Sequence, residues 1–119
     1  MTALFDTNIL IDYLKGHPAA DLEIARYSRR LISAVTWMEL LVGATGAEEE
    51  EVIEMFLRDF IVVPVDRAVA RAAVEVRRRD RVRLPDAIIR ASAEVESALL
   101  VTRNTKDFPS DQPGVRMPY

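Results

Sequence analysis

The 119-residue sequence has no cysteine and only one histidine, and both shortages restrict its chemistry. Without cysteine the chain can form no disulfide, use no thiol nucleophile and bind no zinc through sulfur. No segment approaches the run of about eighteen apolar residues that a membrane span needs. The N-terminus also lacks the basic region and long apolar stretch of a secretory signal. We therefore expect a cytoplasmic protein that does not enter a membrane.

Lysine is scarce as well, because only Lys15 and Lys106 among the 16 basic residues are lysines. The net charge is −3, but the charges are unevenly spread. Six acids crowd positions 48–59, and eight arginines lie between Arg67 and Arg90. This distribution predicts an acidic side and a basic side. Arginine suits planar recognition of phosphate, although codon bias explains its excess equally well.

Short apolar runs alternate with segments of helical periodicity, and the length predicts one domain covering residues 1–119. The expected strands are a run that ends before Asp6, residues 30–33, 60–63 and 98–102, and a possible edge strand at 115–117. The expected helices cover residues 7–15, 19–27, 36–42, 47–58, 67–80 and 84–97. The alternation predicts a three-layer α/β/α fold with a short, mostly parallel central sheet of four to five strands.

Right-handed crossovers would place every strand-to-helix junction at one edge of this sheet, where ligands collect. Asp6 follows the first strand, Glu39 lies near the start of the helix after the second, and Asp86 begins the last helix. Asn104 and Asp107 lie in a turn after the strand at 98–102. The pattern predicts that these side chains meet.

Each of these residues also has a purely structural explanation. Asp6 can cap a helix. Thr36 and Glu39 can form a capping box at the start of a helix that ends at a left-handed Gly43. Asp86 can interact with the helix dipole and pair with Arg90. Turns favour asparagine and aspartate for their own backbone geometry.

Three or four carboxylates brought together would repel one another, and a bound cation would relieve that repulsion. Ligands that are all oxygen favour Mg²⁺ or Mn²⁺ over zinc. Divalent cations held by carboxylates suit phosphodiester hydrolysis, which makes a nucleic acid the expected substrate.

Four short motifs occur in order along the chain: Phe5-Asp-Thr-Asn8, Ser33-x-x-Thr-x-x-Glu-Leu-x-x-Gly43, Pro85-Asp-Ala-Ile-Ile-Arg-Ala91 and Val101-Thr-Arg-Asn-Thr-Lys-Asp-Phe108. Together they resemble the motifs of the PIN-domain family and, more narrowly, those of the VapC toxins of bacterial and archaeal toxin-antitoxin pairs. The resemblance covers essentially the entire chain. Each motif alone is weak evidence, whereas four in order at suitable spacing are strong evidence.

The resemblance implies an endoribonuclease toxin that depends on Mg²⁺ or Mn²⁺, with Asp6, Glu39 and Asp86 as the principal metal-binding acids. The family's fourth acidic position falls in the turn, where Asp107 is favoured and Asn104 is at most a weak, assisting ligand. Similar toxins form homodimers and are silenced by a VapB-like antitoxin. Operator DNA would be bound only through that antitoxin.

Some residues near the motifs are candidate RNA contacts: Thr7, Asn8, Arg79, Arg81, Arg83 and Arg103. The arginine-rich stretch precedes Asp86 and could hold phosphates near the metal, but a solvated basic surface at a helix end explains it equally. Trp37 could stack on a base, or belong to the core or a dimer interface. His17 is expected to be a turn residue.

Two other functions compete with the ribonuclease. The first is a catalytically weak or inactive PIN-like module that acts only with an antitoxin on operator DNA, and the neutral Asn104 keeps this alternative open. The second is a phosphatase with an aspartyl nucleophile after the first strand. That chemistry usually needs a second aspartate two residues on, where this chain has Asn8.

Overall fold

The computed structural model describes all residues 1–119. Its five strands are β1 Thr2–Phe5, β2 Arg29–Ser33, β3 Ile61–Val63, β4 Leu99–Val101 and β5 Val115–Arg116. Its six helices are α1 Thr7–Leu14, α2 Pro18–Ala25, α3 Ala34–Val42, α4 Ala47–Leu57, α5 Arg67–Asp80 and α6 Leu84–Val95. None of these helices is long and apolar enough to cross a membrane.

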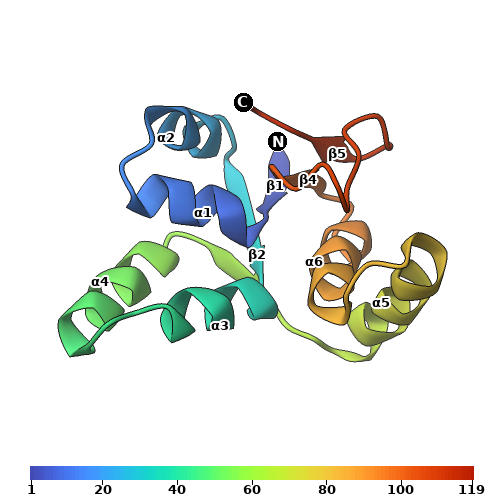
Figure 1. Cartoon of the computed structure of the whole chain (residues 1–119), viewed down its shortest axis with the longest axis horizontal. Helices are drawn as coiled ribbons and strands as arrows, with labels where there is room; N and C mark the ends of the chain where they lie inside the picture. The colour runs from blue at the N-terminus through green and yellow to red at the C-terminus, as the bar shows by residue number, and fades with distance from the viewer.

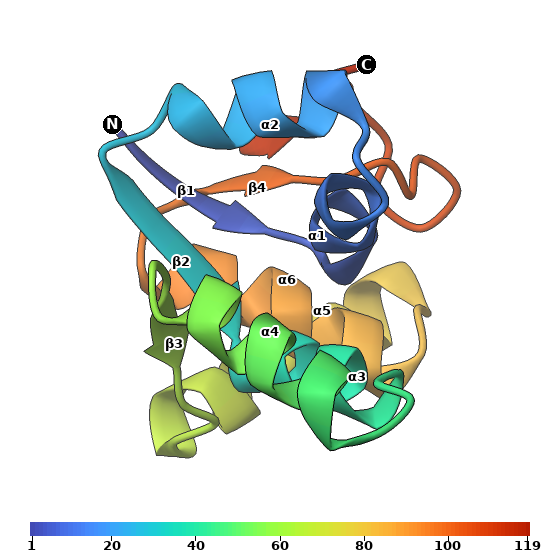
Figure 2. The same ribbon diagram turned by 90° about the vertical axis from the view of Figure 1, so that its left-hand side faces the viewer.

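The strands form one sheet in the order β3-β2-β1-β4-β5, and every neighbouring pair is parallel. Helices α1, α2 and α4 lie on one side of the sheet, and α5 and α6 lie on the other (Figure 1). Helix α3 lies beside α4 (Figure 2) and contributes side chains to the cores on both sides. The predicted three-layer α/β/α fold is confirmed, with a sheet that is parallel throughout.

The central strand β1 is buried on both faces because its side chains alternate between two cores. Leu4 packs with Val76 and other side chains of the core on the α5 and α6 side. Phe5 points to the opposite core, where it packs with Ile9 and contacts the Tyr27 ring edge-on at 5.7 Å between centroids. Packing on both faces fixes the carboxyl end of β1, and with it the position of the next residue.

The acidic and basic segments lie on opposite sides of the sheet, as the charge pattern predicts. The glutamates of α4 are exposed on one side, whereas the arginines of α5 lie on the other (Figure 1). The basic side is therefore the one that also carries α6 and its first-turn acid.

The predicted capping box of α3 is wrong. The helix begins at Ala34, and the Ser33 hydroxyl caps it by accepting a hydrogen bond from the Val35 N–H at 3.1 Å. The buried end of β2 therefore decides where α3 starts, which leaves Glu39 in the second turn. Gly43 is not left-handed either, because its φ is −76°.

Two aspartates act as helix caps, and so does the single histidine. Asp6 caps α1, and Asp66 caps α5 through a 2.9 Å bond from the Val69 N–H. His17 is the N-cap of α2, since its Nδ1 accepts from the Ala19 N–H at 3.3 Å. The capping alternative for Asp6 is therefore correct, and the cap uses only one of its carboxylate oxygens, Oδ1.

Candidate active site

Asp6 lies directly after β1 and is only 4% exposed. Its Oδ1 accepts a hydrogen bond from the Thr7 N–H at 2.7 Å. Its Oδ2 accepts from the Thr102 hydroxyl at 2.7 Å and from the Asn8 side-chain amide at 3.2 Å. These contacts hold the carboxylate in one orientation at the carboxyl edge of the sheet.

Glu39 reaches the same edge from α3. Its Oε1 accepts a hydrogen bond from the Thr7 hydroxyl at 2.7 Å. Because the Thr7 hydroxyl has a single proton, its 2.9 Å contact with the buried Thr36 hydroxyl is one in which Thr36 donates. Thr7 therefore links the start of α1 to α3 and orients the exposed Glu39 side chain.

Asp86 lies in the first turn of α6 and is 9% exposed. Its Oδ2 is buried and has no hydrogen-bond partner. The Arg83 Nε lies 3.5 Å from this oxygen, close enough for an ion pair but too far for a good hydrogen bond. The predicted pair between Asp86 and Arg90 is wrong, because Arg90 bonds Glu94 at 3.1 Å instead.

The turn after β4 holds Asn104 and Asp107 together. The Asn104 amide donates to Asp107 Oδ2 at 3.0 Å, and its Oδ1 accepts from the Asp107 N–H at 3.3 Å. Phe108 is fully buried in the core and anchors the turn. Asn104 therefore orients the neighbouring carboxylate.

The four carboxylates of Asp6, Glu39, Asp86 and Asp107, here named the acid cluster, influence one another electrostatically. Burial raises the pKa of Asp6, and the charges of Asp86 and Glu39 raise it further, against lowering hydrogen bonds from threonines. Burial also raises the pKa of Asp86, and Asp107 and Glu39 add to this, while Arg83 opposes it. Two acids of the cluster are thus costly to keep ionised in the absence of a cation.

The donor chemistry of the acid cluster fits a hard divalent cation. All its donors are carboxylate oxygens, and the buried Asp86 Oδ2 lacks the hydrogen bond that such an atom normally has. No three of the acids already lie together as a set of metal ligands. Glu39 is exposed, so its side chain can rotate toward the others at low cost in packing.

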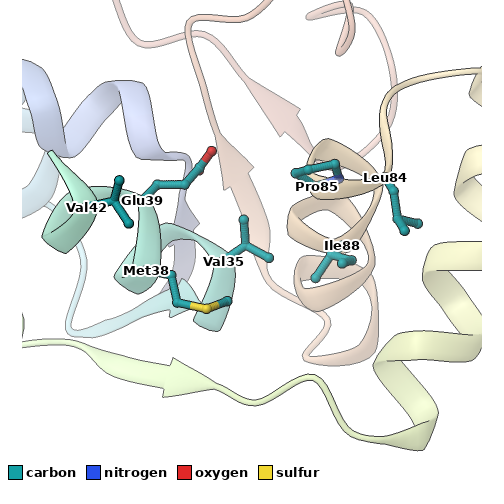
Figure 3. A pocket seen from close by; sticks show the side chains of 7 residues that line it. All are labelled: Val35, Met38, Glu39, Val42, Leu84, Pro85 and Ile88. Carbon is teal, nitrogen blue, oxygen red and sulfur yellow. The ribbon is translucent and has the colours of Figure 1, made fainter.

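An apolar groove of about 540 Å³ runs between α3 and α6. Figure 3 shows the side chains on its two walls: Val35, Met38, Glu39 and Val42 from α3, and Leu84, Pro85 and Ile88 from α6. Glu39 belongs both to the groove and to the acid cluster. The groove therefore opens beside the acids.

Comparison with known proteins places this chain in a family. The PIN domain model matches residues 3–110. The chain is 38% identical over 114 residues to ribonuclease VapC10 of Mycobacterium tuberculosis, which covers 89% of this chain and 85% of the relative. The chain belongs to the VapC family of PIN-domain proteins. The resemblance predicted from the four motifs is confirmed.

Solved structures agree with this VapC assignment. A toxin-antitoxin complex from Klebsiella pneumoniae contains a chain that superposes with a TM-score of 0.93 at 41% identity, covering 99% of this chain and 98% of that one. The DNA-bound VapBC of Salmonella typhimurium gives a TM-score of 0.80 at 28% identity, covering 98% and 96%.

Two candidate RNA contacts of this VapC chain already bind the acid cluster. The Thr7 hydroxyl bonds Glu39, and the Asn8 amide bonds Asp6. Their half-buried side chains are therefore placed to position the acids.

The four candidate arginines lie in different surroundings. Arg79 forms ion pairs with acids of α5 and α6 at 3.0 and 3.1 Å. Arg81 is exposed in a left-handed conformation, with φ 57°, at the end of α5. Arg103 bonds Asp12 at 2.8 Å. Arg83 alone among the four pairs with a member of the acid cluster.

Sequence reasoning gave Thr102 and Thr36 no role at the site, and both support the acids from buried positions. In the parallel register of β1 with β4, Phe5 lies opposite Val101, so Asp6 and Thr102 leave the sheet side by side. The sequence signal for Thr102 was a hydroxyl residue directly after a second buried strand, β4. Thr36 gave no such signal, because its role depends on where α3 begins.

Proposed function

We propose that this protein is the toxin of a toxin-antitoxin pair, a single-domain, metal-dependent endoribonuclease that hydrolyses RNA phosphodiester bonds in the cytoplasm. The observation that carries the proposal is a pair of buried carboxylates with raised pKa, Asp6 and Asp86, beside two further acids. A buried carboxylate whose pKa is raised is costly to keep ionised, and a bound cation would offset that cost. The relative named ribonuclease VapC10 supports the reaction class.

We assign Asp6, Glu39, Asp86 and Asp107 as the residues that hold Mg²⁺, or Mn²⁺ in its place. The hydrogen bonds between Asn104 and Asp107 favour Asp107 as the fourth acid, with Asn104 as the group that orients it. When bound, the cation lowers the pKa of an attacking water and stabilises the oxygen that leaves.

The chain's own side chains prepare this site. Thr102 and Asn8 keep Asp6 in a single orientation, and the Thr7 hydroxyl bonds one oxygen of the exposed Glu39 side chain. Arg83 is 84% exposed, so its ion pair with Asp86 contributes little and can be exchanged for an RNA phosphate.

The partners follow from the same family. The solved structures that resemble this chain are described as toxin-antitoxin complexes, and that from Salmonella typhimurium is bound to DNA. We therefore propose that a VapB-like antitoxin silences this protein, that a homodimer is its assembled form, and that operator DNA is bound only through the antitoxin.

A pair of matched substitutions tests the proposed reaction. Asp6→Asn and Asp66→Asn each change a helix-capping aspartate into a residue that can still cap. Only Asp6 belongs to the acid cluster. We expect Asp6→Asn to reduce Mg²⁺-stimulated RNA cleavage by about 100-fold or more, and Asp66→Asn to leave it unchanged, with both variants folded by circular dichroism.

The contrary result would be cleavage by Asp6→Asn at the wild-type rate, in preparations shown by a mock purification to be free of other nucleases. Cleavage by the wild type that persists at full rate in excess EDTA would also reject the metal dependence.

A further inference from the structure

Arg103 lies in the turn after β4 and forms two hydrogen bonds with residues of α1. Its backbone N–H donates to Asn8 Oδ1 at 3.1 Å, and its guanidinium donates to Asp12 Oδ2 at 2.8 Å. Asn8 and Asp12 are four residues apart and therefore lie on one face of the helix. The turn and the helix are fastened together along that face.

Tyr119 closes this contact from the far end of the chain. Its hydroxyl donates to the same Asp12 Oδ2 at 2.9 Å, and the Arg103 guanidinium lies over its ring, 5.1 Å from the centroid. The His17 ring stacks on the Tyr119 ring at 4.9 Å with an interplanar angle of 12°. Asp12, Arg103 and Tyr119, here named the clamp, thus join three separate parts of the chain.

The electrostatics of the clamp are those of a satisfied ionic contact. Burial raises the pKa of Asp12, but hydrogen bonds from Arg103 and Tyr119 outweigh it, so the pKa is lowered below its ordinary value. The pKa of the Tyr119 hydroxyl is raised by burial and by its bond to Asp12, so it remains a donor at neutral pH. At neutral pH, Asp12 is therefore ionised, and it accepts from the charged Arg103 and from the neutral Tyr119 hydroxyl.

The clamp is connected to the acid cluster through short hydrogen bonds. Asn8 accepts from the Arg103 N–H with its oxygen and donates to Asp6 Oδ2 with its nitrogen. Thr102, the residue before Arg103, donates to the same Asp6 oxygen and accepts from the Asn104 N–H at 2.9 Å. Both groups that orient Asp6 through Oδ2 are thus attached to the segment that the clamp holds.

We propose that Asp12 and Tyr119 are positioning residues, which fix Arg103 and the turn that follows it so that Asn8, Thr102 and Asn104 hold Asp6 and Asp107 ready for the metal. The inference rests on the metal site proposed above. It assigns Arg103 a different role from RNA binding, since its guanidinium is bound within the protein.

The two roles of Arg103 predict different kinetics. A positioning residue alters the metal site, so Arg103→Ala should weaken Mn²⁺ binding and lower kcat while KM for RNA stays nearly constant. A phosphate contact would raise KM and leave Mn²⁺ binding unchanged. Asp12→Ala also separates the roles, because it would free a phosphate-binding arginine for RNA but would loosen a positioning one.

The experiment is a double-mutant cycle on the full chain with Mn²⁺ binding measured by calorimetry in the absence of RNA. We expect Asp12→Ala and Arg103→Ala each to weaken binding about tenfold, at the low end of the effect of indirect metal contacts. The double variant should bind no more weakly than either, because both changes open the same clamp. Tyr119→Phe, which retains the ring, should give a smaller loss.

Matched controls separate the clamp from general damage. Asp21→Ala removes an exposed acid from α2, and Tyr13→Phe removes a hydroxyl from a ring that stacks on Phe56. Neither should change Mn²⁺ affinity. Amide hydrogen exchange at Arg103 should accelerate in Asp12→Ala but in neither control, because its N–H bond to Asn8 is then less protected.

The outcomes distinguish the clamp from the proposed function. If the wild type binds Mn²⁺ and the clamp variants bind it equally well, the clamp proposal fails and the metal site stands. Losses of affinity that add in the double variant would also overturn it. If the wild type binds no Mn²⁺, the proposed function fails, and the positioning role fails with it.

Discussion

Glu23 and Asp86 are both buried acids, but their surroundings differ. Glu23, on α2, is 3% exposed and accepts hydrogen bonds from the Tyr27 hydroxyl at 2.8 Å and from Arg116 at 2.8 and 3.1 Å. Burial raises its pKa, yet these bonds lower it below the ordinary value. Asp86 has one loose ion pair and a buried oxygen without a hydrogen bond, and its pKa is raised.

The difference separates a carboxylate that is compensated within the protein from one that, under our proposal, a cation compensates. Glu23 ties α2 to β5, and its charge is fully compensated within the protein. In the acid cluster, the charges of Asp86 and Glu39 raise the pKa of Asp6, and those of Asp107 and Glu39 raise the pKa of Asp86. Arg83 is the one cation that opposes the rise at Asp86. Burial alone therefore does not mark a functional acid, whereas burial without compensation does.

The largest effect on stability should come from breaking the compensated site. Glu23→Ala leaves Arg116 and the Tyr27 hydroxyl without their partner, so we expect a loss of about 3 kcal/mol in the free energy of unfolding. Glu23→Gln should lose less, since an amide oxygen can still accept from Tyr27. Urea denaturation measures both. A change below about 0.5 kcal/mol for the alanine variant, the range of ordinary surface substitutions, would contradict the structural role.

Divalent cation should act only on the uncompensated site. At a Mg²⁺ concentration of a hundred times its Kd, the wild type should gain about 2.7 kcal/mol of stability by mass action. Glu23→Gln should gain the same amount, and Asp86→Asn should gain almost none. Thermal unfolding with and without Mg²⁺ gives the comparison. An equal gain in Asp86→Asn would place the cation elsewhere.

A smaller effect is expected from the hydroxyl that orients Glu39. Thr7→Val retains the shape but removes the bond to Glu39, and should weaken Mn²⁺ binding about tenfold. Thr45 makes the same type of bond to Glu49 on α4, at 2.6 Å, and Glu49 is not a member of the acid cluster. Thr45→Val is therefore the matched control and should bind Mn²⁺ like the wild type in calorimetry. Equal affinity in both variants would remove Thr7 from the site.

The smallest effect should be the pH dependence of stability without divalent cation, because the two sites change it in opposite directions. The raised pKa of Asp86 means that the folded state binds this proton more tightly than the unfolded state does. As pH falls through that pKa, the free energy of unfolding of the wild type should therefore rise relative to that of Asp86→Asn. The lowered pKa of Glu23 gives stability that is fully present above pH 4.5, the ordinary pKa of the group. That stability is lost as pH falls through the lowered pKa. Urea denaturation of wild type, Asp86→Asn and Glu23→Gln at several pH values measures both signs.

The sequence predicts the sheet edge well because the signals there are local. A buried apolar strand ends at Asp6, and helical periodicity starts again near Asp86, so right-handed crossovers bring both junctions to one edge. The start of α3 was not predictable in the same way. Ser33 and Thr36 are both good caps, and only the packing of β2 decides between them.

Contacts between distant residues explain the rest of what sequence alone did not supply. Arg103 and its partner Asp12 are 91 positions apart, and Tyr119 lies a further 16 positions beyond Arg103. No periodicity or motif connects them, because each is individually a common surface residue. Thr102 was closer to prediction, since it depends only on the β1 and β4 register.

The most direct measurement is anomalous diffraction from crystals grown with Mn²⁺. The account predicts a strong anomalous peak bounded by the carboxylates of Asp6 and Asp86, with Glu39 or Asp107 turned toward it, and no peak near Glu23. Occupancy at that position should disappear in Asp6→Asn crystals grown under the same conditions. A well-ordered wild-type crystal at saturating Mn²⁺ with no peak between Asp6 and Asp86 would contradict the central claim that these buried acids are held for a divalent cation.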